Sequence, residues 1–262
     1  MRISTLGSCY ARYVANQLAM FTNGKIISCT YHNRSDFFVD KYFNNKYDDS
    51  FYISLIEALS TPKKEADKLN PDSNIINILK NQTSIYSGAH RLTSGANFFD
   101  RVDSSDVFIF DNYMDVSAKL FLNEGHDMVF FNSKDPSVKK YLVDQGYVSL
   151  DKMSELLTAQ ISFASFSRII NYVKDKNPKS FVVYLNFPYN TYVGNKERIN
   201  LTKKGESLSA GLNADLILPS LSVPKSLQTH QKQHYKNAFY AYVAGRVIES
   251  LNFRLGMKSK AY

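Results

Sequence analysis

Two side chains able to attack or deprotonate a substrate lie near opposite ends of this sequence of 262 residues. Near the start, Cys9 follows Gly7 and Ser8 between a short apolar run and a helical pattern. Near the end, His234 lies on a polar loop just before a second helical pattern, over residues 237–251. A thiol nucleophile together with an imidazole that acts as general base and then as general acid can carry out nucleophilic catalysis. We therefore expect an active site built from the two ends of the chain.

The turn around Cys9 has further features that suit a nucleophile. Gly7 allows a tight turn, and the residues after it present free backbone N–H groups at a helix N-terminus. This positive potential is expected to lower the pKa of the thiol, and the N–H group of Cys9 could hold an oxyanion. Alternatively, Cys9 is a small buried residue that closes the first helical turn. Spacing alone leaves both interpretations open.

His234 has two rivals for the role of general base. His230 lies on the same loop, and His32 follows an apolar run at residues 25–31. His32 could also orient a substrate, and Arg34 could hold a phosphate or carboxylate. Each of these side chains could equally be a capping or surface residue. Cys29, inside an apolar run, is predicted to belong to the core.

The elements that position these residues alternate between β-rich runs and helical patterns. The predicted strands cover residues 2–6, 25–31, 107–111, 128–132, 180–186 and 214–218. A long helix is predicted over residues 152–174. This rhythm favours a single α/β domain over residues 1–262, with a central parallel sheet between two helical layers. The polar stretch 61–81 is interpreted as a helical or irregular insertion.

Composition narrows the classes of partner. The formal net charge of +8 favours anionic ligands, but no basic tract interleaved with aromatic residues suggests nucleic acid. Two cysteines are too few for a disulfide framework, and neither has metal-ligand spacing, so we expect no metal. No apolar stretch is long enough to span a bilayer, and the first residues lack a secretion signal. These features predict a cytoplasmic protein.

The motifs at the two ends resemble those of the SGNH (GDSL-like) hydrolase superfamily. Gly7-Ser8-Cys9 after a strand, with His234-Tyr235 before the last helix, is most similar to the GSCFA-type and capsular polysaccharide acetyltransferase-like branches. The resemblance implies a three-layer fold with flavodoxin-like strand order. It also implies that Cys9 replaces the usual serine nucleophile and that Ser8 lies beside it as a substrate-binding residue.

The resemblance assigns further residues in the middle of the chain. Asp111-Asn112 stands where the superfamily has Gly-x-Asn-Asp, which implies Asn112 as an oxyanion donor and Asp111 beside it in substrate binding; an ordinary Asx turn is the alternative. Gly88 or Gly95 would supply a second backbone donor. Gln231 replaces the aspartate usually found three residues before the histidine, so a Cys9–His234 dyad is expected instead of a triad.

The implied function is O-acetylation of a surface polysaccharide or its precursor, with acetyl-CoA as the acyl donor. An esterase or thioesterase of the same fold differs only in using water as the acceptor. A non-catalytic glycan-binding domain is the third hypothesis, because fold alone does not define activity.

Overall fold

The computed structural model describes residues 1–60, 73–83, 97–122, 129–130, 143–144, 146, 153–192, 194–231 and 233–259. At its centre is a parallel sheet of five strands in the order β2-β1-β3-β6-β7. The strands are β1 (Arg2–Gly7), β2 (Lys25–Tyr31), β3 (Val107–Asp111), β6 (Phe181–Leu185) and β7 (Leu216–Leu218). This arrangement confirms the predicted α/β class and the flavodoxin-like strand order.

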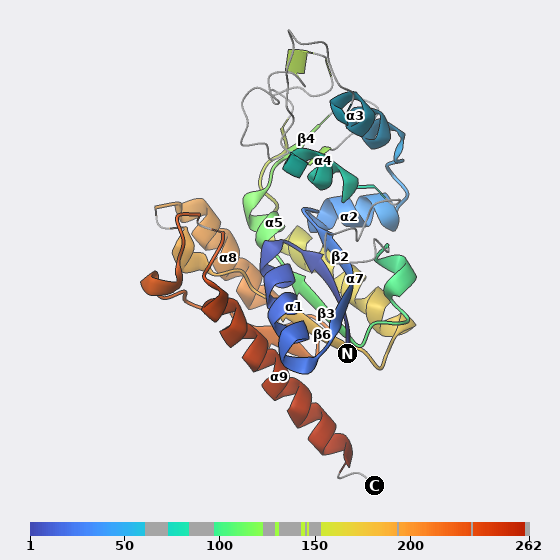
Figure 1. The fold of residues 1–262 in the computed structure, drawn as a ribbon. Helices are drawn as coiled ribbons and strands as arrows, with labels where there is room; N and C mark the ends of the chain where they lie inside the picture. Colours follow the sequence, from blue (N-terminus) through green and yellow to red (C-terminus); the bar gives the residue numbers. More distant parts are fainter. Residues whose placement is uncertain are drawn as a thin grey trace.

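Helices cover both faces of the sheet (Figure 1). On one face, α1 (Cys9–Thr22) packs beside α9 (Asn237–Ser259). On the other face, α7 (Ala159–Lys176) packs between α2 (Ser35–Tyr42) and α8 (Lys196–Ser209) and contacts both. Strand β3 shows why two layers form. Ile109 belongs to the core under α1 and α9, whereas Phe108 and Phe110 belong to the core under α2 and α7. The first and last helices of the chain are therefore neighbours.

A smaller group of elements has its own apolar cluster, which α2 and the short α5 (Tyr113–Ser117) also join. It contains α3 (Ser50–Ser60), α4 (Ser73–Lys80), β4 (Leu120–Phe121) and β5 (Val129–Phe130). Strands β4 and β5 pair antiparallel in a separate two-stranded sheet. The prediction that the run 128–132 joins the parallel sheet is therefore wrong for Val129–Phe130, the part of it that the structure describes. Helix α4 lies in the stretch predicted as an insertion, of which residues 61–72 lie outside the described residues.

Two helix boundaries differ from the sequence prediction. Helix α7 begins at Ala159 because Thr158 caps it, accepting a hydrogen bond from the Ile161 N–H at 3.3 Å. Met153, predicted to lie on this helix, instead pairs with Phe121 in an extended bridge. Helix α9 continues past the predicted end at Leu251 to Ser259, because no proline follows to stop it.

Candidate active site

The turn after β1 is built against the end of β3. Gly7 has a φ of +151°, and a Cβ atom there would lie 2.6 Å from Oδ2 of Asp111, so only glycine fits. Asp111 Oδ2 accepts hydrogen bonds from the Ser8 N–H at 2.7 Å and the Ala11 N–H at 2.9 Å. Its Oδ1 accepts one from the Tyr113 N–H at 2.9 Å. Asp111 thus fixes the turn, and this internal role replaces the predicted contact with substrate.

Ser8 is also occupied within the protein. It is the N-cap of α1, with its hydroxyl accepting a hydrogen bond from the Tyr10 N–H at 3.0 Å and donating one to Asp111 Oδ2 at 3.0 Å. Ser8 is only 4% exposed, whereas Cys9 is partly exposed. The structure therefore gives Ser8 a capping role in place of the predicted substrate contact, and Cys9 is the reachable nucleophilic group of this turn.

The electrostatics of Cys9 differ from the sequence expectation. Burial raises the pKa of the thiol, and the nearby Asp111 carboxylate raises it as well. The charge of Arg12 and a backbone hydrogen bond lower the pKa, but they do not offset the loss of solvation. The predicted lowering of the Cys9 pKa is therefore wrong, and a base must take the proton before the sulfur can attack.

Arg12 lies one helical turn after Cys9, and the sequence analysis did not identify it. Residues at this spacing share one face of a helix, with Cβ atoms about 5–6 Å apart. The Arg12 guanidinium lies over the ring of Tyr13, with a carbon-to-centroid distance of 4.6 Å, and 5.7 Å from the ring of Tyr31 at the end of β2. The i, i+3 spacing from the candidate nucleophile was the signal that could have found it.

His32 follows β2 in an unusual backbone conformation. Its φ is +59°, in the left-handed region, and its N–H donates to the Gly7 carbonyl at 3.0 Å. Its ring centroid lies 4.4 Å from that of Tyr31. Burial, together with the nearby positive charges of Arg12 and His234, lowers the pKa of His32 to about 3. This shift places His32, Arg12 and His234 in one electrostatic neighbourhood, with His32 neutral at physiological pH.

His234 is held in place by its own loop. Its N–H donates to the Gln231 carbonyl at 3.0 Å, and its carbonyl accepts from the Thr229 hydroxyl at 2.9 Å. Its ring meets that of Tyr13 edge-on, with the centroids 5.9 Å apart. Tyr13 follows Arg12 on α1, so the loop before α9 reaches the helix that begins at Cys9. The fold thus brings the two ends of the chain together, as expected.

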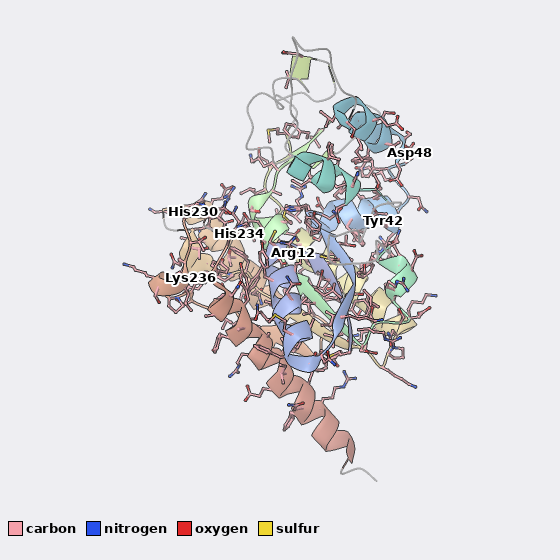
Figure 2. All side chains as sticks on the ribbon, in the orientation of Figure 1. Arg12, Tyr42, Asp48, His230, His234 and Lys236 are labelled. Carbon is pink, nitrogen blue, oxygen red and sulfur yellow. The ribbon has the colours of Figure 1, made fainter. Side chains whose placement is uncertain are left out.

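The other predicted histidine lies on the same loop but has a different environment. His230 is exposed, whereas His234 is partly buried against α1. Figure 2 shows both residues on the loop ahead of α9, with Arg12 on α1. This difference in burial favours His234 as the base.

Asn112 does not present its amide to the thiol. Its Oδ1 accepts a hydrogen bond from the Phe187 N–H at 2.8 Å, and its side chain also hydrogen-bonds to the Tyr184 hydroxyl on β6. Asn112 is almost fully buried. In this structure, Asn112 is therefore not placed as the predicted oxyanion donor. The alternative backbone donors, Gly88 and Gly95, lie outside the described residues.

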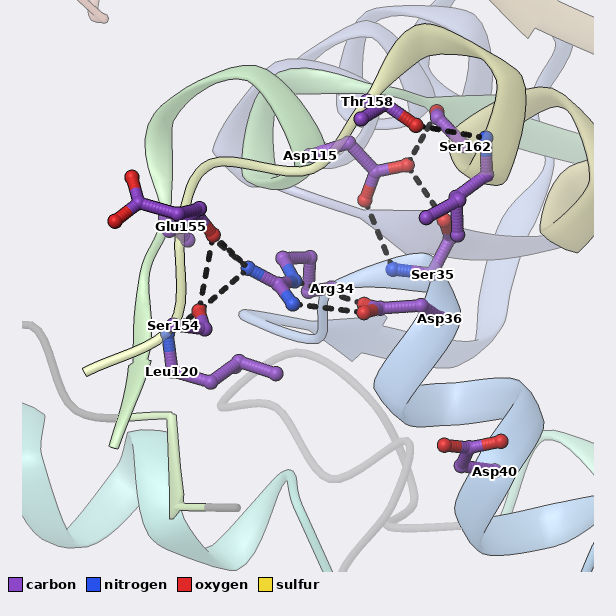
Figure 3. Close-up of polar contacts among 12 residues, drawn as sticks. Arg34, Ser35, Asp36, Asp40, Asp115, Leu120, Ser154, Glu155, Thr158 and Ser162 are labelled. Carbon is purple, nitrogen blue, oxygen red and sulfur yellow. Dashed lines mark hydrogen bonds and ion pairs between the residues drawn. The ribbon is translucent and has the colours of Figure 1, made fainter. Parts of the chain in front are cut away.

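Arg34 is a structural residue and not the predicted anion clamp. Its guanidinium is buried and makes an ion pair with Asp36, with Nη2 2.7 Å from Oδ2 (Figure 3). Its Nη1 donates to the Ser154 hydroxyl and to the Glu155 carbonyl, each at 3.0 Å. These contacts join the start of α2 to the segment that leads into α7.

The described part of the chain has no group of three or more His, Cys, Asp or Glu side chains placed to hold a metal ion. Nor does any helix within it combine the length and apolar character that crossing a membrane requires.

Comparisons with known proteins give structural neighbours only. No protein-family model matches the chain, and no curated protein matches it. One similar solved structure is an acetyl xylan esterase from the rumen bacterium Butyrivibrio proteoclasticus, with 10% identity, a TM-score of 0.44 and 98% of this chain covered. Another is a family two carbohydrate esterase from Clostridium thermocellum in complex with cellohexaose, with 10% identity, a TM-score of 0.46 and 97% covered. This chain spans 64% of the length of each.

Proposed function

We propose that this chain hydrolyses an acyl ester through a thioester formed on Cys9. His234 takes the proton of the Cys9 thiol, and the sulfur attacks the ester carbonyl. The tetrahedral intermediate then collapses, breaking the bond to the alkoxy oxygen, which leaves as an alcohol with the proton returned by His234. Water attacks the thioester with the same base, releasing a carboxylic acid and restoring the thiol.

One observation carries this proposal. The turn between β1 and α1 has two adjacent candidate nucleophiles, Ser8 and Cys9. The hydrogen bonds within the turn engage the side chain of Ser8. Ser8 caps the helix and bonds to Asp111, whereas Cys9 begins the helix, is partly exposed and lies near the positive charge of Arg12. Because its pKa is raised, Cys9 depends on a neighbouring base, and we assign this role to His234, whose ring contacts Tyr13 on the same helix.

An acylated carbohydrate is the proposed substrate class. The support is the likeness of the Gly7-Ser8-Cys9 and His234-Tyr235 motifs to those of the SGNH superfamily, several branches of which handle O-acetyl groups on glycans. The net charge of +8 supports a second candidate, in which acetyl-CoA donates the acyl group and a polysaccharide hydroxyl replaces water as the acceptor. Both reactions pass through the same thioester.

The test is the intact mass of the protein after brief exposure to p-nitrophenyl acetate and an acid quench. We expect an acetyl adduct on the unchanged protein and on Cys29→Ala, and none on Cys9→Ala. Cys29→Ala is the matched control, because it removes the only other thiol in the chain. An adduct that persists in Cys9→Ala, or no adduct and no release of p-nitrophenol above buffer, would overturn the proposal.

A second experiment separates the acceptors. The protein is given an acetylated oligosaccharide in one reaction and acetyl-CoA with the unacetylated oligosaccharide in another. Release of acetate in the first reaction supports the esterase. Sugar-dependent release of free CoA in the second supports the transferase.

A further inference from the structure

The candidate site needs an oxyanion donor beyond the backbone of Cys9. A tetrahedral intermediate formed on the thiol carries a negative oxygen, and each well-placed donor stabilises it substantially. The amide of Asn112, the side chain expected to supply this donor, is bound to Phe187 and Tyr184. Another polar side chain near Cys9 is therefore a candidate for the role.

His32 is held close to the nucleophile turn by a strained backbone. Residues other than glycine rarely adopt the left-handed region, and such strain tends to occur at functional sites. The His32 N–H bonds to the carbonyl of Gly7, two residues before Cys9. The strained conformation therefore fixes the end of β2 to the turn that carries the thiol.

The surroundings of His32 suit a hydrogen-bond donor better than a base. Its ring centroid lies 4.4 Å from that of Tyr31, the last residue of β2, which is paired in register with Gly7. Burial, together with the positive charges of Arg12 and His234, lowers the pKa of His32 and strongly disfavours its protonation. A neutral imidazole keeps one N–H group to donate but accepts a proton poorly when its pKa is this low.

We propose that the imidazole of His32 donates a hydrogen bond to the oxyanion formed when Cys9 attacks an acyl carbonyl. This inference rests on the proposed function. It assigns His32 to stabilising the intermediate, whereas His234 moves the proton.

Two reactions of Cys9 test the assignment. Acylation by p-nitrophenyl acetate passes through an oxyanion, whereas alkylation by iodoacetamide displaces iodide from a saturated carbon and forms none. A donor to the oxyanion affects only the first reaction, but a base or a residue that shapes the turn affects both. Both rates are followed by mass on the Cys29→Ala background, so that Cys9 is the only thiol.

The variants are His32→Gly and His32→Asn. Glycine and asparagine both tolerate a left-handed backbone, but only asparagine has a side-chain hydrogen-bond donor. We expect His32→Gly to lower the acylation rate about 10²-fold to 10³-fold, with alkylation unchanged within about twofold. His32→Asn should recover part of the acylation rate. Circular dichroism and the melting temperature check that both variants are folded.

Acylation of His32→Gly at the unchanged rate would overturn the proposal. So would a parallel fall in acylation and alkylation. Failure of the proposed function is separately visible, because the protein with His32 intact would then form no acetyl adduct on Cys9.

Discussion

Two polar clusters in this protein use similar side chains in opposite ways. The Cys9 cluster comprises Cys9, Arg12, His32 and His234, near the carboxyl ends of β1 and β2. The Arg34 cluster comprises Arg34, Ser35, Asp36, Asp115 and Ser162, with the hydroxyl of Ser154 and the carbonyl of Glu155 (Figure 3). The Arg34 cluster is almost entirely buried, whereas the residues of the Cys9 cluster are partly exposed.

The clusters differ in how their charges are matched. In the Arg34 cluster, opposite charges meet, and Asp115 accepts from the Ser35 N–H at 2.8 Å and the Ser162 hydroxyl at 2.5 Å. In the Cys9 cluster, the thiol lies near the charge of Arg12, His32 lies near the charges of Arg12 and His234, and the backbone of His32 is strained. Removing one partner of a buried ion pair leaves an uncompensated charge and destabilises the fold, whereas perturbed pKa values and backbone strain are typical of functional sites.

The largest expected effect is on the Cys9 cluster. His234→Ala should lower acylation of Cys9 about 10²-fold to 10⁴-fold, because the buried thiol then loses its base. His230→Ala is the matched control on the same loop and should leave the rate unchanged. Initial release of p-nitrophenol measures both rates. A slow His230→Ala beside a normal His234→Ala would exchange the two assignments.

The Arg34 cluster should respond in stability instead. Arg34→Ala leaves Asp36 without its buried partner and should lower the free energy of unfolding by about 3–5 kcal/mol. Arg2→Ala removes an exposed ion pair with Asp106 and should cost much less, because solvent screens the pair. Urea titration followed by circular dichroism measures both. Equal losses in the two variants would show that the Arg34 cluster contributes no more than a surface pair.

Arg12→Gln probes the charge beside the nucleophile. Without the guanidinium, the pKa of the Cys9 thiol should rise further, so alkylation by iodoacetamide at pH 7.5 should slow roughly threefold to tenfold. Arg12→Lys keeps the charge and should restore most of the rate. Arg168→Gln, an exposed arginine on α7, is the control. Unchanged alkylation by Arg12→Gln would remove Arg12 from the cluster's electrostatics.

The smallest net effect is expected in the dependence of stability on pH, because the contributions of the two clusters have opposite signs and partly cancel. As pH falls below about 6.5, the unfolded chain protonates His32 but the folded protein does not, because its folded pKa is about 3. This residue therefore makes the free energy of unfolding fall, by at most about 1.4 kcal/mol per pH unit. Burial raises the pKa of Asp115 to about 6, so the folded protein takes up a proton there first and gains stability as pH falls toward 4.

Urea titrations at pH 7 and pH 4.5 separate the two contributions. His32→Asn should lose less stability on acidification than the unchanged protein, and Asp115→Asn should lose more. A His32→Asn variant with an unchanged acid loss would show that His32 titrates normally in the folded state.

Much of the fold could be predicted from the sequence. The spans of β2 and β3 match the predicted runs residue for residue, because continuous β-rich segments between turn signals define buried parallel strands. The run 128–132 has the same local pattern, but Val129–Phe130 within it pairs in a separate antiparallel sheet. Local composition indicates a strand, but the choice of partner depends on distant residues.

The site was predicted less completely than the fold. The meeting of the Cys9 turn with the His234 loop follows from strand order and from the packing of α1 on α9. Four residues have roles that differ from the predictions, because each side chain bonds to a partner far away in the sequence or inside the same turn. These residues are Ser8, Asp111, Asn112 and Arg34. No spacing rule reveals those partners.

The sequence by itself determined the α/β class, the turn that presents Cys9 and the position of His234 ahead of the last helix, because these depend on residue type and short-range periodicity. Only the tertiary structure decided which polar groups are satisfied internally and which gather around the thiol. It also decided that burial outweighs the helix N-terminus in setting the pKa of Cys9. Desolvation and long-range hydrogen bonding depend on every surrounding atom, and those atoms come together only in the folded chain.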